Sequence, residues 1–163
     1  MLHEVKTMGT FEVTSGKVYV TDPCYSEDII RENVLEVANG TWIAKAIYDG
    51  GTCMKLVAFL EGHDKATPRD VAPFGVDVDS GQAGIFDVAS YKKDELVNEP
   101  IWFDPEDPWY SLCCQKTLSN DEAGIIPGGA VASSGYGDGS YKAFTDEKDG
   151  KIVAIVIDFG DTF

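Results

Sequence analysis

Lys151-Ile152-Val153-Ala154-Ile155-Val156-Ile157-Asp158-Phe159 is the strongest strand signal of the chain, because it is rich in β-branched residues and apolar at successive positions. Neighbouring side chains of a strand point to opposite faces, so a strand of this kind is buried on both faces and lies in the centre of a sheet. Asp149-Gly150 stands directly before it. This two-residue turn predicts a hairpin with the segment that begins at Tyr141.

Further strand signals occur along the whole chain, and glycine-containing turns separate many of them. Three of these turns predict hairpins of their own: Ser15-Gly16, Asn39-Gly40 and the turn at residues 80–82. Asp49-Gly50-Gly51 turns the chain into another strand. The expected strands are residues 10–14, 17–21, 34–38, 41–48, 52–60, 74–79, 83–87, 129–134, 141–144 and 151–159.

Helix signals are few. Residues 26–33 predict a short helix that Ser26 can cap, and one helical turn is expected near Asp94. Residues 109–114 fit a short helix or a strand equally well. No repeat or linker divides the chain, so we expect residues 1–163 to form a single β-rich domain: an antiparallel β-sandwich or open barrel with one or two short helices.

The charge limits the partners. The 163 residues carry 28 Asp and Glu against 13 Lys and Arg, a formal net charge of −15. Such a charge repels phosphate backbones and anionic membrane surfaces, so we expect neither direct nucleic-acid binding nor membrane binding. Three interpretations stay open: a surplus of charge for solubility, affinity for cations or basic partners, and imitation of nucleic acid.

The N-terminus and the cysteines indicate the compartment. The start of the chain lacks the basic and apolar regions of a signal peptide, which predicts a cytoplasmic protein. Cys24, Cys53, Cys113 and Cys114 show no C-x-x-C spacing, so we expect reduced thiols and no zinc finger.

Ser133-Ser134-Gly135-Tyr136-Gly137-Asp138-Gly139-Ser140-Tyr141 is the segment most indicative of a site, because it offers polar groups and flexible backbone where a strand carries apolar side chains. It lacks the lysine of a phosphate-binding loop and the βαβ frame of a dinucleotide-binding motif. Residues 77–81 resemble the start of an EF-hand loop, but the loop continues into Ile85-Phe86 instead of closing with a carboxylate.

Carboxylates at strand ends are the candidate metal ligands or acid and base groups. Asp22, Asp77, Asp79, Asp87 and Asp138 all lie at strand ends or in glycine-flanked turns. If they converge, they can bind a divalent cation through hard oxygen ligands or act as an acid/base pair. The alternative is that each aspartate bonds its own turn backbone, as aspartates in turns usually do.

Cys24 is the candidate nucleophile. It follows Asp22 and precedes Tyr25 just after a strand, and His63 is the histidine that a cysteine mechanism would need as its base. A buried apolar cysteine is the alternative. A zinc site of Cys113, Cys114 and an aspartate with His63 is a further hypothesis.

Three motifs taken together resemble a known family. Residues 20–25, residues 78–87 and residues 133–141, followed by a strand that ends Ile157-Asp158-Phe159, are similar to motifs of the DUF4241-like group of small bacterial and phage proteins. No activity can be carried over from that group. The resemblance implies one shared polar site, whose ligand-binding candidates are Asp22, Tyr25, Asp79, Ser80, Gln82, Ser134, Asp138 and Tyr141.

Three functions are compatible with these features. The first is a non-catalytic binding protein of bacterial or phage origin, which holds a small molecule or a protein in the polar site. The second is a metal-dependent or cysteine-dependent hydrolase or transferase with Asp22, Cys24 and Asp138 as candidate catalytic residues. The third is an acidic protein that imitates nucleic acid and occupies a basic partner.

Overall fold

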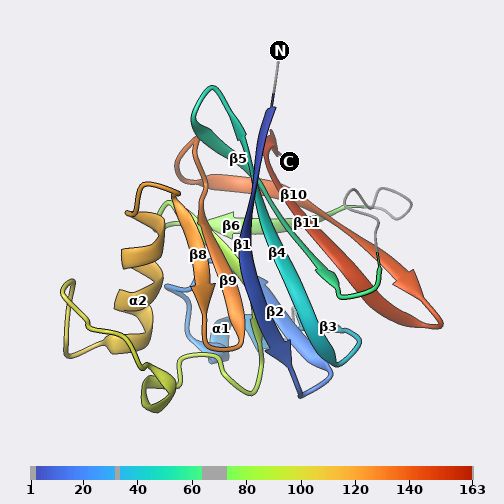
Figure 1. Cartoon of the computed structure of the whole chain (residues 1–163), viewed down its shortest axis with the longest axis horizontal. Helices are drawn as coiled ribbons and strands as arrows, with labels where there is room; N and C mark the ends of the chain where they lie inside the picture. The colour runs from blue at the N-terminus through green and yellow to red at the C-terminus, as the bar shows by residue number, and fades with distance from the viewer. Residues whose placement is uncertain (1–2, 32–33, 64–72, 163) are drawn as a thin grey trace.

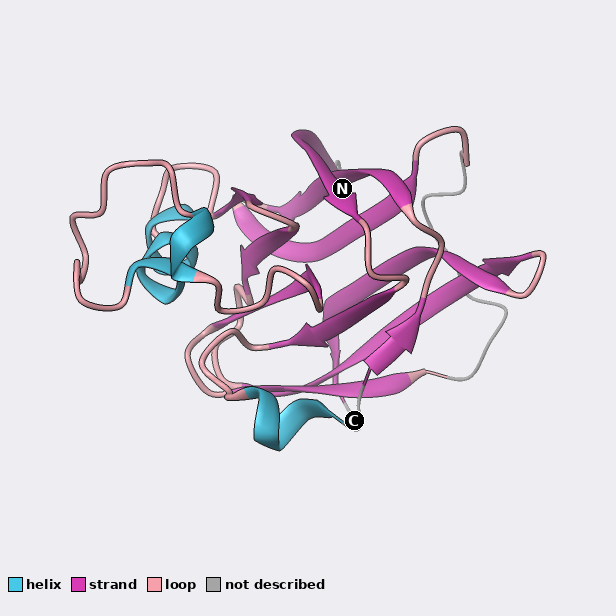
Figure 2. Ribbon diagram, turned by 90° about the horizontal axis from the view of Figure 1, so that it is seen from below, coloured by secondary structure: helices cyan, strands magenta, loops and turns pink. Residues whose placement is uncertain are grey.

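Two antiparallel β-sheets face each other in a sandwich, and short helices lie outside it (Figure 1). The structure is a computed structural model, which describes residues 3–31, 34–63 and 73–162. Over these residues neither sheet closes into a barrel, so of the two expected architectures the sandwich is the one found. Figure 2 shows the layers from below, with the helices at the periphery of the strands.

Sheet A has six strands, in the order β1 (His3–Val13), β4 (Gly40–Asp49), β5 (Thr52–Leu60), β11 (Lys151–Thr162), β10 (Gly139–Lys148) and β6 (Phe74–Val78). Sheet B has five strands, in the order β3 (Val34–Glu36), β2 (Lys17–Thr21), β7 (Gln82–Asp87), β9 (Gly129–Ser133) and β8 (Ala123–Ile126). The helical elements are α1 (Glu27–Ile30), the 3₁₀ turn η2 (Asp94–Leu96) and α2 (Pro108–Thr117).

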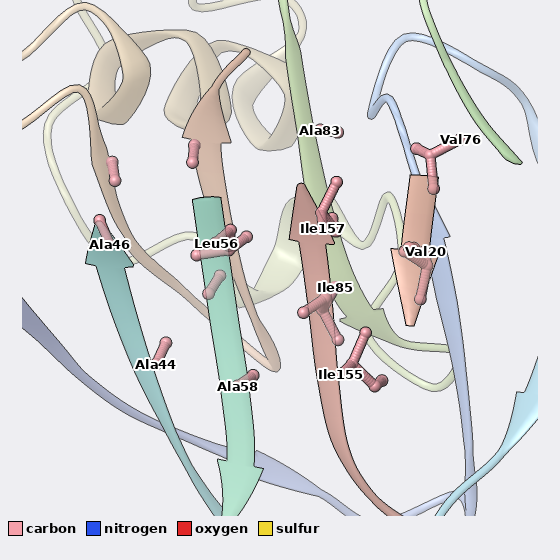
Figure 3. Packing of buried hydrophobic residues seen from close by; sticks show 14 of the residues in the cluster. Val20, Ala44, Ala46, Leu56, Ala58, Val76, Ala83, Ile85, Ile155 and Ile157 are labelled. Carbon is pink, nitrogen blue, oxygen red and sulfur yellow. The ribbon is translucent and has the colours of Figure 1, made fainter. Parts of the chain in front are cut away.

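The central position of β11 is confirmed. It lies between β5 and β10, where Val156 pairs with Val57 on one side and with Phe144 on the other. Eight successive residues of β11, 152–159, are buried. Ile155 and Ile157 point into the core between the sheets (Figure 3), whereas Val156 packs on the outer face of sheet A.

The three predicted hairpins at Ser15-Gly16, Asn39-Gly40 and residues 80–82 are wrong. In the described chain, four short turns instead carry the backbone from one sheet to the other, and we call them the first to fourth crossings. They join β1 to β2, β3 to β4, β6 to β7 and β9 to β10. The hairpin at Asp149-Gly150 is confirmed by the pairing of Lys148 with Lys151.

Side chains that are distant in the sequence bind the turn backbone at the first crossing. The buried Asp87 carboxylate accepts hydrogen bonds from the Thr14 backbone N–H at 2.9 Å and the Thr14 hydroxyl at 3.2 Å. In the second crossing, Asn39 Oδ1 accepts the N–H of Gly16 at 2.6 Å. The turn backbone is therefore satisfied by these side chains, and no hairpin ladder is needed to satisfy it.

The remaining predictions have mixed outcomes. The turn near Asp94 is confirmed as η2, and the undecided residues 109–114 lie in α2. The helix predicted at residues 26–33 is found as α1, which covers Glu27–Ile30; Ser26 forms no side-chain cap hydrogen bond, and residues 32–33 lie outside the described residues. Strand β8 was not predicted. All four cysteines are free, as expected. No helix in the described part of the chain is long and apolar enough to cross a bilayer.

Candidate functional site

The three polar motifs meet where the third and fourth crossings pass the end of β2. Asp22 Oδ2 accepts the backbone N–H groups of Asp79 at 2.8 Å and Ser80 at 2.6 Å. Asp138 Oδ1 accepts the N–H of Gly81 at 3.0 Å. Residues 22–25, 79–82 and 134–141 therefore form one structural unit, which we call the three-motif corner.

Asp22 is the anchor of this corner. Asp22 is 0% exposed, and its carboxylate is fully hydrogen-bonded. Besides the two N–H groups on Oδ2, Oδ1 accepts the Ser80 hydroxyl at 2.6 Å and the Cys24 N–H at 2.8 Å. An ionised carboxylate has about four lone-pair sites, and four donors occupy them here. The Asp22 carboxylate thus binds the turn of the third crossing.

The glycine-rich loop is held by its own hydroxyl groups. The buried Ser134 hydroxyl and the Tyr141 hydroxyl both donate to the carbonyl oxygen of Gly137, each at 2.7 Å. Gly135 has φ +67° and lies so close to the Cys53 carbonyl that a Cβ atom would overlap it. Glycine is required there by both conformation and space. Asp138 is the exposed carboxylate of the loop.

Gln82 connects the corner to α2. Its side chain is buried, and its Oε1 accepts the Thr117 hydroxyl at 3.2 Å while Nε2 donates to Cys114 Sγ at 3.5 Å. Tyr110 lies on the same helix, and burial is the main cause that raises its pKa to about 12. We did not predict Tyr110 or Thr117, because periodicity does not define a helix over so short a stretch.

Lys92 is a second residue that the sequence did not indicate. Its backbone has φ +57°, an uncommon conformation for a residue with a side chain. Its ammonium group donates to the Pro23 carbonyl at 2.7 Å and lies 5.6 Å from the ring centroids of Tyr91, Trp109 and Tyr110. These cation–π contacts place a positive charge behind the three-motif corner.

Cys24 is exposed, so the expectation of a buried cysteine is wrong. Partial burial of its thiol, with the hydrogen bond and negative charge of Asp22, raises the pKa of Cys24 to about 12. The thiolate is the nucleophilic form of cysteine, and a pKa this high keeps the thiol protonated at neutral pH.

His63 does not supply a base for Cys24. Its Nε2 lies 3.1 Å from Asp146 Oδ2, and Asp146 is eight residues beyond Asp138 along β10. At about 3.3 Å per residue, the distance from Asp146, which contacts His63, to Asp138, which lies in the same corner as Cys24, is on the order of 25 Å. The Cys24–His63 pair considered from the sequence is therefore not formed.

The aspartates do not assemble a metal centre. Across residues 3–31, 34–63 and 73–162, no group of three or more His, Cys, Asp and Glu side chains is placed to hold a metal ion. Asp87 lies at the first crossing, and Asp77 is an exposed residue of β6. Cys113 and Cys114 are buried on α2, whereas His63 contacts Asp146 of β10.

A cleft of about 510 Å³ opens beside the corner, between α1 and β6. Tyr25 lies at its border with a shallower groove that also contains Asp79 and Asp138. The Tyr25 hydroxyl donates to the Asp79 carboxylate, and burial followed by this hydrogen bond raises the pKa of Tyr25. The described residues that line the cleft are Tyr19, Val20, Thr21, Tyr25, Ile29, Ile30, Val34, Leu35, Phe74, Gly75, Val76 and Asp77.

The predicted ligand-binding residues thus fall into two groups. Tyr25, Asp79 and Asp138 line open space. The other five have side chains engaged inside the protein: Asp22, Ser80, Gln82, Ser134 and Tyr141. Comparison with models of protein families, with curated proteins and with solved structures finds no match for this chain.

Proposed function

We propose that this protein is a non-catalytic, cytoplasmic binding protein of bacterial or phage origin that holds a small molecule in the cleft between α1 and β6. One observation carries the proposal: an open cleft of about 510 Å³ lies directly beside a corner whose polar groups are hydrogen-bonded internally. Small-molecule sites are typically pre-formed cavities of about 300–1,000 Å³, lined by apolar residues with a few polar groups.

The lining indicates the chemistry of the ligand. Val20, Leu35, Phe74 and Val76 supply apolar walls. Asp77 is a lining residue of the cleft and of the adjoining groove, which also contains Asp79 and Asp138. A ligand with an apolar body and an amine would bury the body in the cleft and place its charge among these carboxylates.

The hydrolase or transferase hypothesis has weaker support. The Cys24 thiol is protonated at neutral pH, and the four acceptor sites of the Asp22 carboxylate are occupied. The nucleic-acid-imitating hypothesis rests on the charge of −15 alone. Membership of the DUF4241-like group stays a prediction.

Calorimetry with a panel of aromatic and aliphatic amines tests the proposal, with the corresponding carboxylic acids as matched probes. We expect the amines to bind and the acids not to bind. Leu35→Trp, which fills the cleft, is expected to abolish binding, whereas Leu118→Trp, at a residue 64% exposed elsewhere, leaves it unchanged. Equal affinity of the Leu35→Trp variant, or turnover of a bound amine, would contradict the proposal.

A further inference from the structure

The loop between η2 and α2 presents two aromatic side chains to solvent. Residues 97–107, which we call the aromatic loop, project beyond the sheets beside α2, at the left of Figure 1, and Figure 2 shows the same projection from below. Trp102 is 65% exposed and Phe103 is 49% exposed, whereas Trp42 and Trp109 are buried. Exposed single apolar residues are common, but two adjacent large aromatic rings at the tip of one loop are a typical contact surface.

Gln115 fixes this loop from α2. Its Oε1 accepts the backbone N–H of Trp102 at 2.8 Å and that of Phe103 at 3.2 Å, and its Nε2 donates to the Pro100 carbonyl at 3.1 Å. The two rings pack edge to face with centroids 6.2 Å apart. Because one helical side chain holds the backbone at Pro100, Trp102 and Phe103, the two aromatic residues are positioned before any partner arrives, which lowers the entropy cost of binding.

The surroundings of the rings are acidic. The segment 94–107 contains six carboxylates and no lysine or arginine. All six residues are exposed, and Glu99 is the one that forms an ion pair, with Lys116 at 2.8 Å. A groove of about 410 Å³ adjoins the segment, where Leu96 and Glu99 face β1 and β8. Apolar and acidic groups are therefore combined on one surface.

We propose that the aromatic loop is a docking surface for a protein partner that presents arginine side chains within an apolar patch. Arginine suits both components of this surface, because its guanidinium stacks on Trp and Phe rings and pairs with carboxylates in bidentate geometry. An acidic or neutral partner would not compensate the five carboxylates of this segment other than Glu99, which pairs with Lys116. The surface is separate from the small-molecule cleft, since none of the described cleft residues belongs to the loop.

Binding of a synthetic peptide tests this proposal directly. The probe is a 12-residue peptide that alternates arginine and leucine, and the matched probe has glutamate in place of arginine. Trp102 is the exposed tryptophan among the three, so its fluorescence reports on the loop. We expect the arginine peptide to shift this fluorescence in a salt-dependent manner and the glutamate peptide to leave it unchanged.

Calorimetry on variants separates the loop from the general negative charge. We expect Trp102→Ala to weaken binding of the arginine peptide at least tenfold. Gln115→Ala is expected to weaken it severalfold at an unchanged melting temperature, and Gln115→Glu, which keeps the acceptor for both N–H groups, to restore part of the affinity. Leu118→Ala, an exposed apolar residue outside the loop, is the control and should bind as the wild type does.

Two results would overturn the proposal. The first is a Trp102→Ala, Phe103→Ala double variant that binds the arginine peptide as tightly as the wild type, because binding would then depend on net charge alone. The second is a wild-type protein that binds the arginine peptide no more tightly than the glutamate peptide.

Discussion

Asp22→Asn is the substitution that most directly tests the structure of the three-motif corner. The change keeps the shape of the side chain but replaces one carboxylate oxygen by an NH₂ group. Oδ2 accepts two backbone N–H groups, and Oδ1 accepts one N–H and the Ser80 hydroxyl. In the place of Oδ2 the NH₂ group of asparagine would face two backbone N–H groups and could accept from neither, whereas in the place of Oδ1 it would lose the Cys24 N–H but could donate to the Ser80 hydroxyl oxygen.

The expected loss of stability follows from these contacts. A hydrogen bond to a charged group contributes about 1.5–3 kcal/mol and one to a neutral group about 0.5–1.5 kcal/mol, so the loss of one bond and the weakening of the other three would cost about 3–6 kcal/mol. Removal of a buried charge returns part of its desolvation cost, so we expect the lower part of this range, about 3–4 kcal/mol. For a chain of this length the melting temperature should fall by roughly 6–16 °C.

Urea unfolding followed by circular dichroism measures this effect. Asp138→Asn is the matched control in the same corner, because Asp138 is exposed and its carboxylate accepts the Gly81 N–H at 3.0 Å. We expect a loss of no more than about 1 kcal/mol for that variant. An Asp22→Asn variant that unfolds within about 1 kcal/mol of the wild type would show that the carboxylate is not what holds the third crossing.

Three other perturbations test other parts of the molecule. Gly135→Ala should lower the free energy of unfolding by more than about 3 kcal/mol, because its Cβ would overlap the Cys53 carbonyl. Gly137→Ala, at φ +93° but with open space around it, should lower it by only about 1 kcal/mol, and thermal unfolding measures both changes. Because its pKa is raised to about 12, the Cys24 thiol is mostly protonated at pH 8. It should react with iodoacetamide at least about a hundredfold more slowly than free cysteine, and the rate should rise with pH. Mass spectrometry measures the rate of labelling, and labelling at the rate of free cysteine at pH 8 would contradict the expectation. Asp87→Asn should destabilise the first crossing by about 2–4 kcal/mol in urea unfolding, and an unchanged midpoint would show that the Asp87 carboxylate is not needed there.

The strands could be predicted from the sequence, but most of their partners could not. Alternation and turn glycines located residues 52–60, which are the observed bounds of β5. The turn residues of the first three crossings look like those of hairpins, because Gly16 and Gly81 have the positive φ that a hairpin turn needs. At two of these crossings a side chain that is distant in the sequence binds the turn: Asp87 binds Thr14, and Asp22 binds Ser80. No local pattern contains that information.

For the candidate site, too, one part could be predicted from the sequence and another could not. That the three motifs are close together was expected, and the hydrogen bonds from Asp22 and Asp138 to the 79–81 turn show them in contact. Which side chains stay accessible depends on burial, and the type of residue does not reveal it: Asp22 is buried and Asp79 exposed. The position of Lys92 could not be predicted, because it lies in a segment without periodicity and its partners are three aromatic rings that it contacts through cation–π interactions.

The central position of β11 has a consequence for how the chain folds during synthesis. Sheet A needs residues 151–162 between β5 and β10, so those two strands cannot be joined until the ribosome has passed residue 162. Until then the free edge of β5 presents unpaired backbone N–H and C=O groups, which can pair with a strand of another chain. We expect the nascent protein to depend on chaperones more than a sandwich built from successive hairpins would, and to fold slowly because most strand pairings join distant segments.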